Sequence, residues 1–501
     1  AHLEEGERRG LLVEDTGGFA FAHALVRDAL AAGTSATRRA LLHREAGRLL
    51  AARPGADAAA IAHHARLGRD PELAARALTD AGRVASARYD QVEAAGLLDE
   101  AIALHDSADA RLVRGRVRLL LTNHAGALED ALVAEHLGGG APALELAAWA
   151  SHYLREFAAA AAYADAGAAT ASDPLVRSGC LAIGGWTRMS IGSLRDAEPV
   201  LVAAMEVAGV RPHAMAPVGL GGLRLFQGRL DESLHVFGGL TEWPDDPQPA
   251  LTQAYVHMLR GMALGHAGRP VDALAEFTAM ESNVATRNLE RFVARADNFI
   301  AWVLRNMGQT IEARERNERA LELAAPRHLG EPWCHALADL AADQVLAGDA
   351  DAATALLDEH DVRAVANHSL PWRHITRARV LRGRVSLLRH DPDEAEATGA
   401  KVIEDARALD MARYVVLGQV LIVQARLTRG DAGDVDEIGQ LLASLPAQAG
   451  LEAWWLTADV ARRAGVDAWW ALAERQLGVL AAHAGPHRSA LEAAGRRVLD
   501  R

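Results

Sequence analysis

Hydrophobic residues recur at helical spacing along most of the chain, and a polar turn interrupts them at a nearly constant interval. Each copy has a Gly or a substitute, two or three polar residues, and then an acidic or small residue that opens the next hydrophobic stretch. Successive copies are 36, 40, 40, 40, 42 and 40 residues apart. A fixed period in this range predicts a solenoid of helix pairs. The copies begin at Gly192, Gly228, Gly268, Gly308, Gly348, His390 and Gly430.

Small residues at fixed distances from these turns support the same repeat. Five positions after the turn a second small residue follows, and nine positions after it Phe237, Phe277 and Leu357 provide bulk. A small residue lets the partner helix approach closely. These offsets resemble the tetratricopeptide repeat, lengthened from about 34 residues to 40. Seven positions before the turn the chain has Gly185, Gly221, Gly261, Ala301, Ala341 and Gly383, with Val423 as the exception.

The repeats are regular at 173–430 and irregular on either side. This change divides the chain into four predicted regions. Residues 11–14 and 19–21, around a Gly-rich turn, predict a β-hairpin that follows the end of a helix. We therefore expect residues 1–33 to be the end of a winged-helix module and residues 34–137 to be junction helices with irregular first repeats. Residues 138–430 form the predicted repeat array, and residues 431–501 form capping helices because they lose the turn.

Local signals place helices within residues 34–137. Thr34 or Ser35 is suited to cap a helix that runs to Leu49. Asp70 before Pro71 predicts another start, with Pro at the first helical position, and that helix is expected to reach about residue 89. Further helices are predicted near 90–106, 109–122 and 125–136.

Composition favours helices and narrows the function. Half of the residues are hydrophobic, with Ala prominent, and aromatic residues make up 5%. The net charge of −13 argues against nucleic-acid binding by the whole chain. Lys401 is the only lysine, and its Gly-Ala-Lys-Val context lacks the phosphate loop that ATP hydrolysis of the P-loop type requires.

Cysteine usage and hydropathy favour a reduced compartment. Cys180 and Cys334 lie far apart, so the sequence contains neither a disulfide framework nor a C-x-x-C zinc site. A signal peptide and an apolar run of about 18 residues are both missing from the sequence. We expect a cytoplasmic protein that does not interact with a membrane.

The first hundred residues resemble a known bacterial junction. Together their motifs are similar to the boundary between the winged-helix module and the helical repeats in signal-transduction ATPases with numerous domains (the STAND class), which include large LuxR-type transcriptional activators. The resemblance covers residues 1–105. The motifs are Phe21-Ala-His23-Ala-Leu25-Val-Arg27-Asp-Ala29-Leu30, then Arg38-Arg39, Leu42-His43, Ala46 and Leu49, and then Ala62-His63-His64 with Gly68.

This resemblance implies a longer parent protein. A nucleotide-binding ATPase domain would precede the chain, and a helix-turn-helix domain often follows in such proteins. ATP is then the cofactor of the upstream domain, and no cofactor is expected in this chain. DNA would be bound only through a domain outside it.

The sequence gives little support for a catalytic or metal-binding site. His63 and His64 are adjacent, so their side chains point about 100° apart on a helix and do not form a metal-binding pair. We expect one packed and one surface histidine there, and a structural role for His23. The sequence has no G-x-S-x-G or H-E-x-x-H motif, and we expect neither a metal site nor an enzyme.

The groove of the array is the better candidate site. With the turn residue as zero, offsets −13, −10 and −6 lie on one stripe of the first helix of each pair. Arg, Asn, His and aromatic side chains on such a stripe are suited to an acidic peptide or a polar small molecule. The stripe comprises Tyr255, Arg295, His335 and Arg377 at −13, Met258 and Asn298 at −10, and Trp186, Met262, Trp302 and Arg384 at −6.

Alternatives remain open for the tryptophans and for the function. Trp186 and Trp302 are equally compatible with core packing, and Trp333 and Trp372 with the rim of the groove. The sequence favours a sensor in which an inducer or a partner protein binds the solenoid and biases an upstream ATPase. An interaction scaffold without a small ligand is the main alternative, and the chain is compatible with a homo-oligomer.

Overall fold

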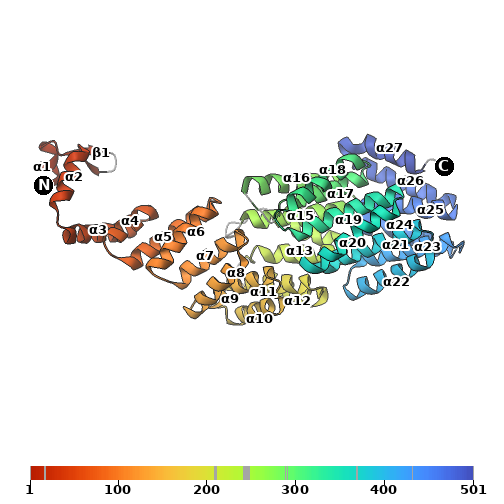
Figure 1. The fold of residues 1–501 in the computed structure, drawn as a ribbon, viewed down its shortest axis with the longest axis horizontal. Helices are drawn as coiled ribbons and strands as arrows, with labels where there is room; N and C mark the ends of the chain where they lie inside the picture. The colour runs from red at the N-terminus through yellow and green to blue at the C-terminus, as the bar shows by residue number, and fades with distance from the viewer. Residues whose placement is uncertain are drawn as a thin grey trace. The chain divides into compact units, whose positions relative to one another are not determined.

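The computed structural model describes residues 2–15, 18–207, 211–240, 249–287, 289, 292–367, 370–431 and 433–499, and helices dominate it (Figure 1). The chain forms two compact units. Unit 1 comprises residues 1–118 and 129–139, and unit 2 comprises residues 119–128 and 140–501. The expected boundaries at 33, 137 and 430 stay predictions. Within the described residues, no helix has the length and apolar character needed to cross a membrane.

Unit 1 begins with a small helix–hairpin–helix segment and continues as helix pairs. The predicted hairpin is confirmed: its strands are antiparallel, with Leu12 opposite Phe21. Its turn residues Thr16 and Gly17 lie outside the described residues, and the winged-helix assignment stays a prediction. The elements are α1 (His2–Arg8), β1 (Leu12–Asp15), β2 (Gly18–Phe21), α2 (Ala24–Gly33), α3 (Ala36–Ala51), α4 (Ala58–Leu67), α5 (Pro71–Ala87), α6 (Gln91–Leu104), α7 (Ala108–Leu120) and α8 (His124–His136), the last two shared with unit 2.

The helix starts in unit 1 follow the local signals. Ser35 Oγ accepts a hydrogen bond from the backbone N–H of Arg38 at 3.3 Å, which caps α3. Asp70 Oδ1 accepts one from the N–H of Leu73 at 3.3 Å and caps α5, with Pro71 in the first turn. These bonds satisfy N–H groups that have no partner inside the helix.

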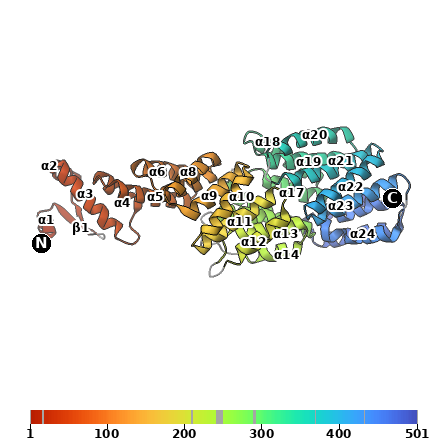
Figure 2. The ribbon, with the colours of Figure 1, turned by 90° about the horizontal axis from the view of Figure 1, so that it is seen from below.

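Unit 2 is an array of antiparallel helix pairs (Figures 1 and 2). Each helix packs mainly on its neighbours along the chain, as expected for a tetratricopeptide-like solenoid. The elements are α9 (Gly140–Tyr153), α10 (Phe157–Thr170), α11 (Pro174–Ser190), α12 (Leu194–Met205), α13 (Met215–Gln227), α14 (Leu230–Gly238), α15 (Pro249–His266), α16 (Pro270–Arg287), α17 (Arg295–Asn306), α18 (Thr310–Ala324), α19 (Gly330–Ala347), α20 (Ala350–Asn367), α21 (Pro371–Leu388), α22 (Pro392–Ala408), α23 (Ala412–Thr428), α24 (Val435–Ala449), η2 (Gly450–Glu452), α25 (Ala453–Ala464), α26 (Asp467–Ala482), η3 (Gly485–His487) and α27 (Arg488–Leu499).

The recurring turn joins the two helices of a pair through a left-handed residue. The turn glycines have φ between 72° at Gly268 and 92° at Gly192, where glycine avoids the clash of a side chain. His390, which replaces Gly in one copy, takes the same conformation with φ of 58°. In the first six copies the second helix begins two residues after the turn residue. The periodic turn therefore has the predicted role.

The small residues before the turns accommodate bulky side chains of neighbouring helices. A Cβ at Gly221 would lie 2.6 Å from the Phe237 ring, and one at Gly261 would lie 2.5 Å from the Phe277 ring. Both rings are fully buried. The close approach predicted from the sequence is confirmed at these two pairs, and dense packing makes any added methyl group costly there.

The array winds far enough for early and late helices to meet. Helix α13 packs on α23 (Figure 2), and both α15 and α17 pack on η2. Trp372 Nε1 donates to the carbonyl oxygen of Met189 at 2.9 Å, and Gln227 Nε2 donates to Asp410 Oδ2 at 3.0 Å. These contacts join residues 183 positions apart. Unit 2 is therefore a superhelix in which earlier helices contact later ones.

Candidate functional site

A cavity of about 520 Å³ lies inside the superhelix of unit 2. Its walls come from the first helices of successive pairs, from α13 to α25, with contributions from η2 and α27. First helices were expected to line the concave face, and the cavity has this lining. The exposed side chains of Leu346 and Arg497 belong to the lining and mark where it reaches the surface.

Aromatic side chains form much of the wall, and hydrogen bonds fix their orientation. Trp455 Nε1 donates to Asn306 Oδ1 at 3.1 Å. Trp302 Nε1 donates to Glu452 Oε1 at 3.4 Å, and the Trp302 ring lies 4.9 Å from the ring of His266. Buried indole N–H groups need such partners, which leaves the ring faces as apolar surfaces. The aromatic lining consists of Phe226, Phe299, Trp302, Trp372, Tyr414, Trp454 and Trp455.

Arginines supply most of the charge in this cavity. Among the described lining residues, Glu452 is the only carboxylate. Lysine does not contribute, and arginine is the cation best suited to planar anions because its guanidinium donates two parallel hydrogen bonds. The lining arginines are Arg305, Arg373, Arg377, Arg384, Arg413 and Arg497.

Carboxylates behind the wall neutralise some of these arginines. Arg305 donates to Asp343 at 2.6 Å and to Asp339 at 2.8 Å, and Arg377 also contacts Asp339. Both aspartates are buried. Burial raises the pKa of Asp339, but the two adjacent guanidinium groups outweigh it and hold this pKa below its ordinary value. Asp339 therefore stays charged and anchors two arginines at once.

Glu452 carries the remaining negative charge. Its Oε1 lies 3.0 Å from Arg413 Nη2, and Arg413 Nη1 donates to the carbonyl oxygen of Gln448 at 2.8 Å. Burial opposes ionisation of Glu452, yet Arg413, Arg384 and Arg377 lower its pKa below the ordinary value. Because Glu452 belongs to η2 and also accepts from Trp302 of α17, it joins two turns of the superhelix.

Two histidines of the cavity have lowered pKa values, in part because arginines lie nearby. Burial is the main reason that the pKa of His266 lies well below its ordinary value, and Arg413, Arg373 and Arg377 lower it further. Burial likewise lowers the pKa of His335, again with help from nearby arginines. Both imidazoles are therefore neutral near pH 7.

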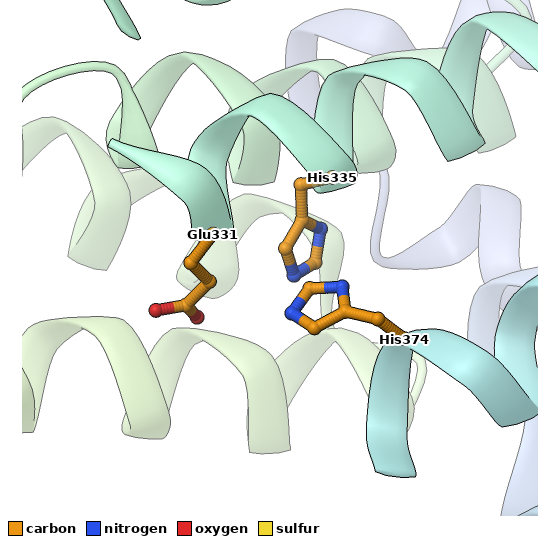
Figure 3. Close-up of side chains that lie close together, drawn as sticks. All are labelled: Glu331, His335 and His374. Carbon is orange, nitrogen blue, oxygen red and sulfur yellow. The ribbon is translucent and has the colours of Figure 1, made fainter. Parts of the chain in front are cut away.

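A cluster of metal-ligating residue types adjoins the cavity. Glu331, His335 and His374 place one possible ligand atom each within 4.8 Å of one another (Figure 3). Arg295 contacts the Glu331 carboxylate, and both Arg373 and Arg377 contact the ring nitrogens of His335. A metal cation would lie among these guanidinium groups and would have to displace them. The surroundings of the cluster therefore suit an anion better than a metal.

Half of the predicted stripe lines the cavity. Trp302 belongs to the lining, so of its two predicted positions, groove or core, it occupies the groove. Trp372, considered as a rim residue, also belongs to the wall, whereas Trp333 lies beneath the guanidinium of Arg363 at 3.3 Å from the ring centroid. The stripe residues in the lining are Met262, Trp302, His335, Arg377 and Arg384.

Five stripe residues lie elsewhere. Trp186 is core: it is buried, and its Nε1 donates to the carbonyl oxygen of Met215 at 3.3 Å. Met258 and Asn298 are also buried between helices. Tyr255 packs its ring on Trp186 and Phe292, and Arg295 pairs with Glu331.

The path of the cavity explains these departures. The cavity meets α15 and α17 near their carboxyl ends, at Met262 and Trp302, but it meets α23 and α25 near their amino ends, at Arg413 and Trp454. It begins at α13, one pair after Trp186. A fixed offset from the turn therefore selects lining residues in some repeats only.

Some lining residues were missed although the stripe pointed toward them. Arg305 and Arg373 lie at offsets −3 and −17, one helical turn beyond the two ends of the stripe. Glu452, Trp454 and Trp455 follow the last turn at Gly430, so the repeat offers no offset for them. Their place in the wall depends on how the superhelix closes.

Other candidate groups have structural environments. His64 is half-buried with its Nδ1 2.9 Å from His43 Nδ1, and His63 is exposed, as predicted for this pair. Cys180 and Cys334 are buried free thiols, and burial raises the pKa of each to about 12. Neither thiol forms the reactive thiolate near neutral pH.

Comparisons with known proteins do not show a family for this chain. No protein-family model matches the chain, and no curated protein matches it. The solved structures that match include the crystal structure of a Rap protein complexed with competence and sporulation factor. That chain is 13% identical, with 64% of this chain and 96% of that chain covered and a TM-score of 0.41. The function of this chain has to be inferred from its own cavity.

Proposed function

We propose that unit 2 is the ligand-binding part of a regulatory repeat protein. The observation that carries this proposal is the cavity of about 520 Å³ with tryptophan walls and convergent arginines. Its volume falls in the range of about 300–1,000 Å³ that is common for small-molecule sites. Apolar walls with a few placed polar groups are the usual composition of such sites.

The shape of the site favours a small molecule over an extended peptide. Trp302 and Trp455 come from helix pairs far apart in sequence, and Asn306 links them within one wall. A trough for a peptide would remain open along the array, as in repeat proteins that use a long concave surface. The scaffold without a small ligand is thus the less favoured alternative.

Coupling to a larger parent protein is the regulatory part of the proposal. Ligand in the cavity would touch η2 and α17 together, and would thereby bias the curvature of the superhelix. A ligand shifts such an equilibrium when it binds one form better. The motifs in residues 1–105 support a STAND-class transcriptional regulator, in which an upstream ATPase domain binds ATP and a separate domain binds DNA.

Exposed apolar side chains in unit 1 support a protein contact there. Leu25 is 82% exposed, and Leu41 and Leu42 are 58% and 59% exposed. Isolated exposed leucines are ordinary, but several on two successive helices are typical of a contact surface. We propose the ATPase domain of the parent as the partner, and a second copy of the chain would compete for the same side chains.

The ligand-binding role can be tested by retention of small molecules. The purified chain is incubated with the small-molecule fraction of a bacterial extract, desalted, denatured and examined by mass spectrometry. Ala342 lines the cavity, so Ala342→Trp fills it, whereas Ala355 is exposed on α20 and Ala355→Trp is the matched control. We expect the native chain and the Ala355→Trp variant to retain a compound that the Ala342→Trp variant loses. Retention of the same compounds by all three proteins would contradict the proposal.

A further inference from the structure

We propose that the ligand of this cavity is an organic anion, with a carboxylate or phosphate group held by the arginines and an apolar body against the tryptophans. This inference rests on the proposed function and names the chemical class of its ligand. The cavity supplies both halves of the recognition: guanidinium groups for the acid and ring faces for the body.

Among the described residues, Arg384 lines the cavity without a direct ion pair, although the charges of Glu452 and Asp459 favour its protonated form. Its guanidinium lies 4.8 Å from the ring centroid of Trp455, on the wall of the cavity. Within the described part of the chain no carboxylate lies within ion-pair distance of it, whereas Arg382 on the same helix contacts both Asp358 and Asp361. Burial lowers the pKa of Arg384 despite Glu452 and Asp459, so its charge is incompletely compensated and an anionic ligand would stabilise it.

Neighbouring lining residues also have donors that are incompletely paired. Arg373 is buried. Its Nη1 lies 3.8 Å from Glu331, its Nη2 contacts the neutral ring of His335, and its guanidinium lies 5.8 Å from the ring centroid of Phe226. Arg305 Nη2 and Trp454 Nε1 are buried donors of lining residues that have no hydrogen-bond partner among the described residues. Buried donors without acceptors are uncommon in folded proteins. Because these two atoms are not accessible in this structure, a bound acid would reach them only if neighbouring side chains moved.

The charge of the lining disfavours a cationic ligand. Six arginines and a single carboxylate line the cavity within the described residues. A cationic ligand would be repelled, and a neutral ligand would add no charge opposite Arg384. The carboxylates that neutralise Arg305 and Arg377 lie behind the wall, on α19, and do not occupy the space itself.

The test compares a charged and a neutral aromatic dye. Anilinonaphthalenesulfonate carries one negative charge, and phenylnaphthylamine is an uncharged counterpart; both report binding by fluorescence. We expect Arg384→Gln to weaken binding of the sulfonate by about tenfold to a hundredfold, the range for one hydrogen bond to a charged group. Binding of the neutral dye should change less than about twofold, since the aromatic walls are intact.

Two variants separate the charge from the fold. Arg384→Lys keeps the positive charge and should restore part of the affinity for the sulfonate. Arg382→Gln removes an arginine from the outer face of the same helix and should leave both dyes unaffected. Equal sulfonate affinity in the native chain and in Arg384→Gln would overturn the proposal, as would equal losses in Arg384→Gln and Arg382→Gln.

Competition then identifies the acidic group. Naphthoate, naphthyl phosphate and naphthalenemethanol share one ring system and differ in the group that they carry. Displacement of the sulfonate dye by either acid, but not by the alcohol, supports the proposal. Whichever of naphthoate and naphthyl phosphate displaces the dye at the lower concentration shows whether the site prefers a carboxylate or a phosphate. Displacement by the alcohol as strongly as by the acids would overturn it.

The proposed function can survive this failure. If Ala342→Trp blocks the neutral dye while Arg384→Gln leaves the sulfonate unaffected, the cavity binds ligands without selecting anions. If neither dye responds to Ala342→Trp, the cavity is not the binding site and both proposals fail.

Discussion

His266 and His335 lie beside arginines in a buried environment, so protonation of either imidazole opposes folding. In the folded chain their pKa values are held well below the ordinary value of 6.5, mainly by burial and then by Arg413 for His266 and Arg373 for His335. In the unfolded chain each returns to about 6.5. Between the two values the unfolded chain binds more protons, so stability is fully present above about pH 6.5 and declines as the pH falls.

The expected slope is about 1.4 kcal/mol per pH unit for each of the two histidines. Urea unfolding followed by tryptophan fluorescence between about pH 5 and pH 7 measures it, above the range in which carboxylates titrate. In His266→Gln the dependence of the unfolding free energy on pH should fall by about 1.4 kcal/mol per pH unit, the contribution of one histidine. An unchanged slope in that variant would assign the pH dependence to other groups.

Single residues also show how far a repeat pattern predicts a site. Trp186 and Trp302 occupy the same offset from their turns, yet only Trp302 lines the cavity. The offset determines which face of a first helix a residue occupies. What lies opposite that face depends on helices more than a hundred residues away, and local spacing holds no information about them.

Two turn glycines differ in the space around them but share the same left-handed backbone, so they separate backbone strain from steric crowding. Gly308 and Gly348 have nearly the same φ, 79° and 80°. A Cβ at Gly348 would meet nothing within 4 Å, whereas one at Gly308 would lie 2.5 Å from the Cβ of Ala494. Gly348→Ala is expected to cost about 1–2 kcal/mol from the left-handed backbone alone.

Gly308→Ala should cost about 1–3 kcal/mol more, because the added methyl group overpacks the contact with α27. Urea midpoints of the two variants measure this difference. Adding Ala494→Gly should recover part of the loss in Gly308→Ala and none in Gly348→Ala. Equal losses in the two glycine variants would show that α27 does not press on this turn.

Helix pairs and their boundaries were predictable because their causes are local. The glycine turns, the cap at Asp70 and the small residues opposite Phe237 and Phe277 act within one repeat. The site was predictable only in part, since Arg377 and Arg384 follow the stripe while Glu452 follows from closure of the superhelix. Closure is a sum of small rotations between repeats, which no single motif encodes.

Glu452 provides a test of closure for unit 2 as a whole. Glu452→Gln removes the ion pair with Arg413 and weakens the contact with Trp302. We expect faster amide hydrogen exchange in α17 and in η2 and α25 together, because the contact joins residues 150 positions apart. Glu437→Gln, at an exposed position in α24, is the control. Faster exchange confined to η2 and α25 would contradict closure through this residue.

The contact between Trp302 and Glu452 also orders events during synthesis. The ribosome adds about 5–20 residues per second, so 150 residues separate the two side chains by roughly 8–30 seconds. During that interval α17 is complete, but Glu452, which accepts the hydrogen bond of its tryptophan, has not yet been made. The nascent array therefore completes the earlier walls of the cavity before the helices that close it are made.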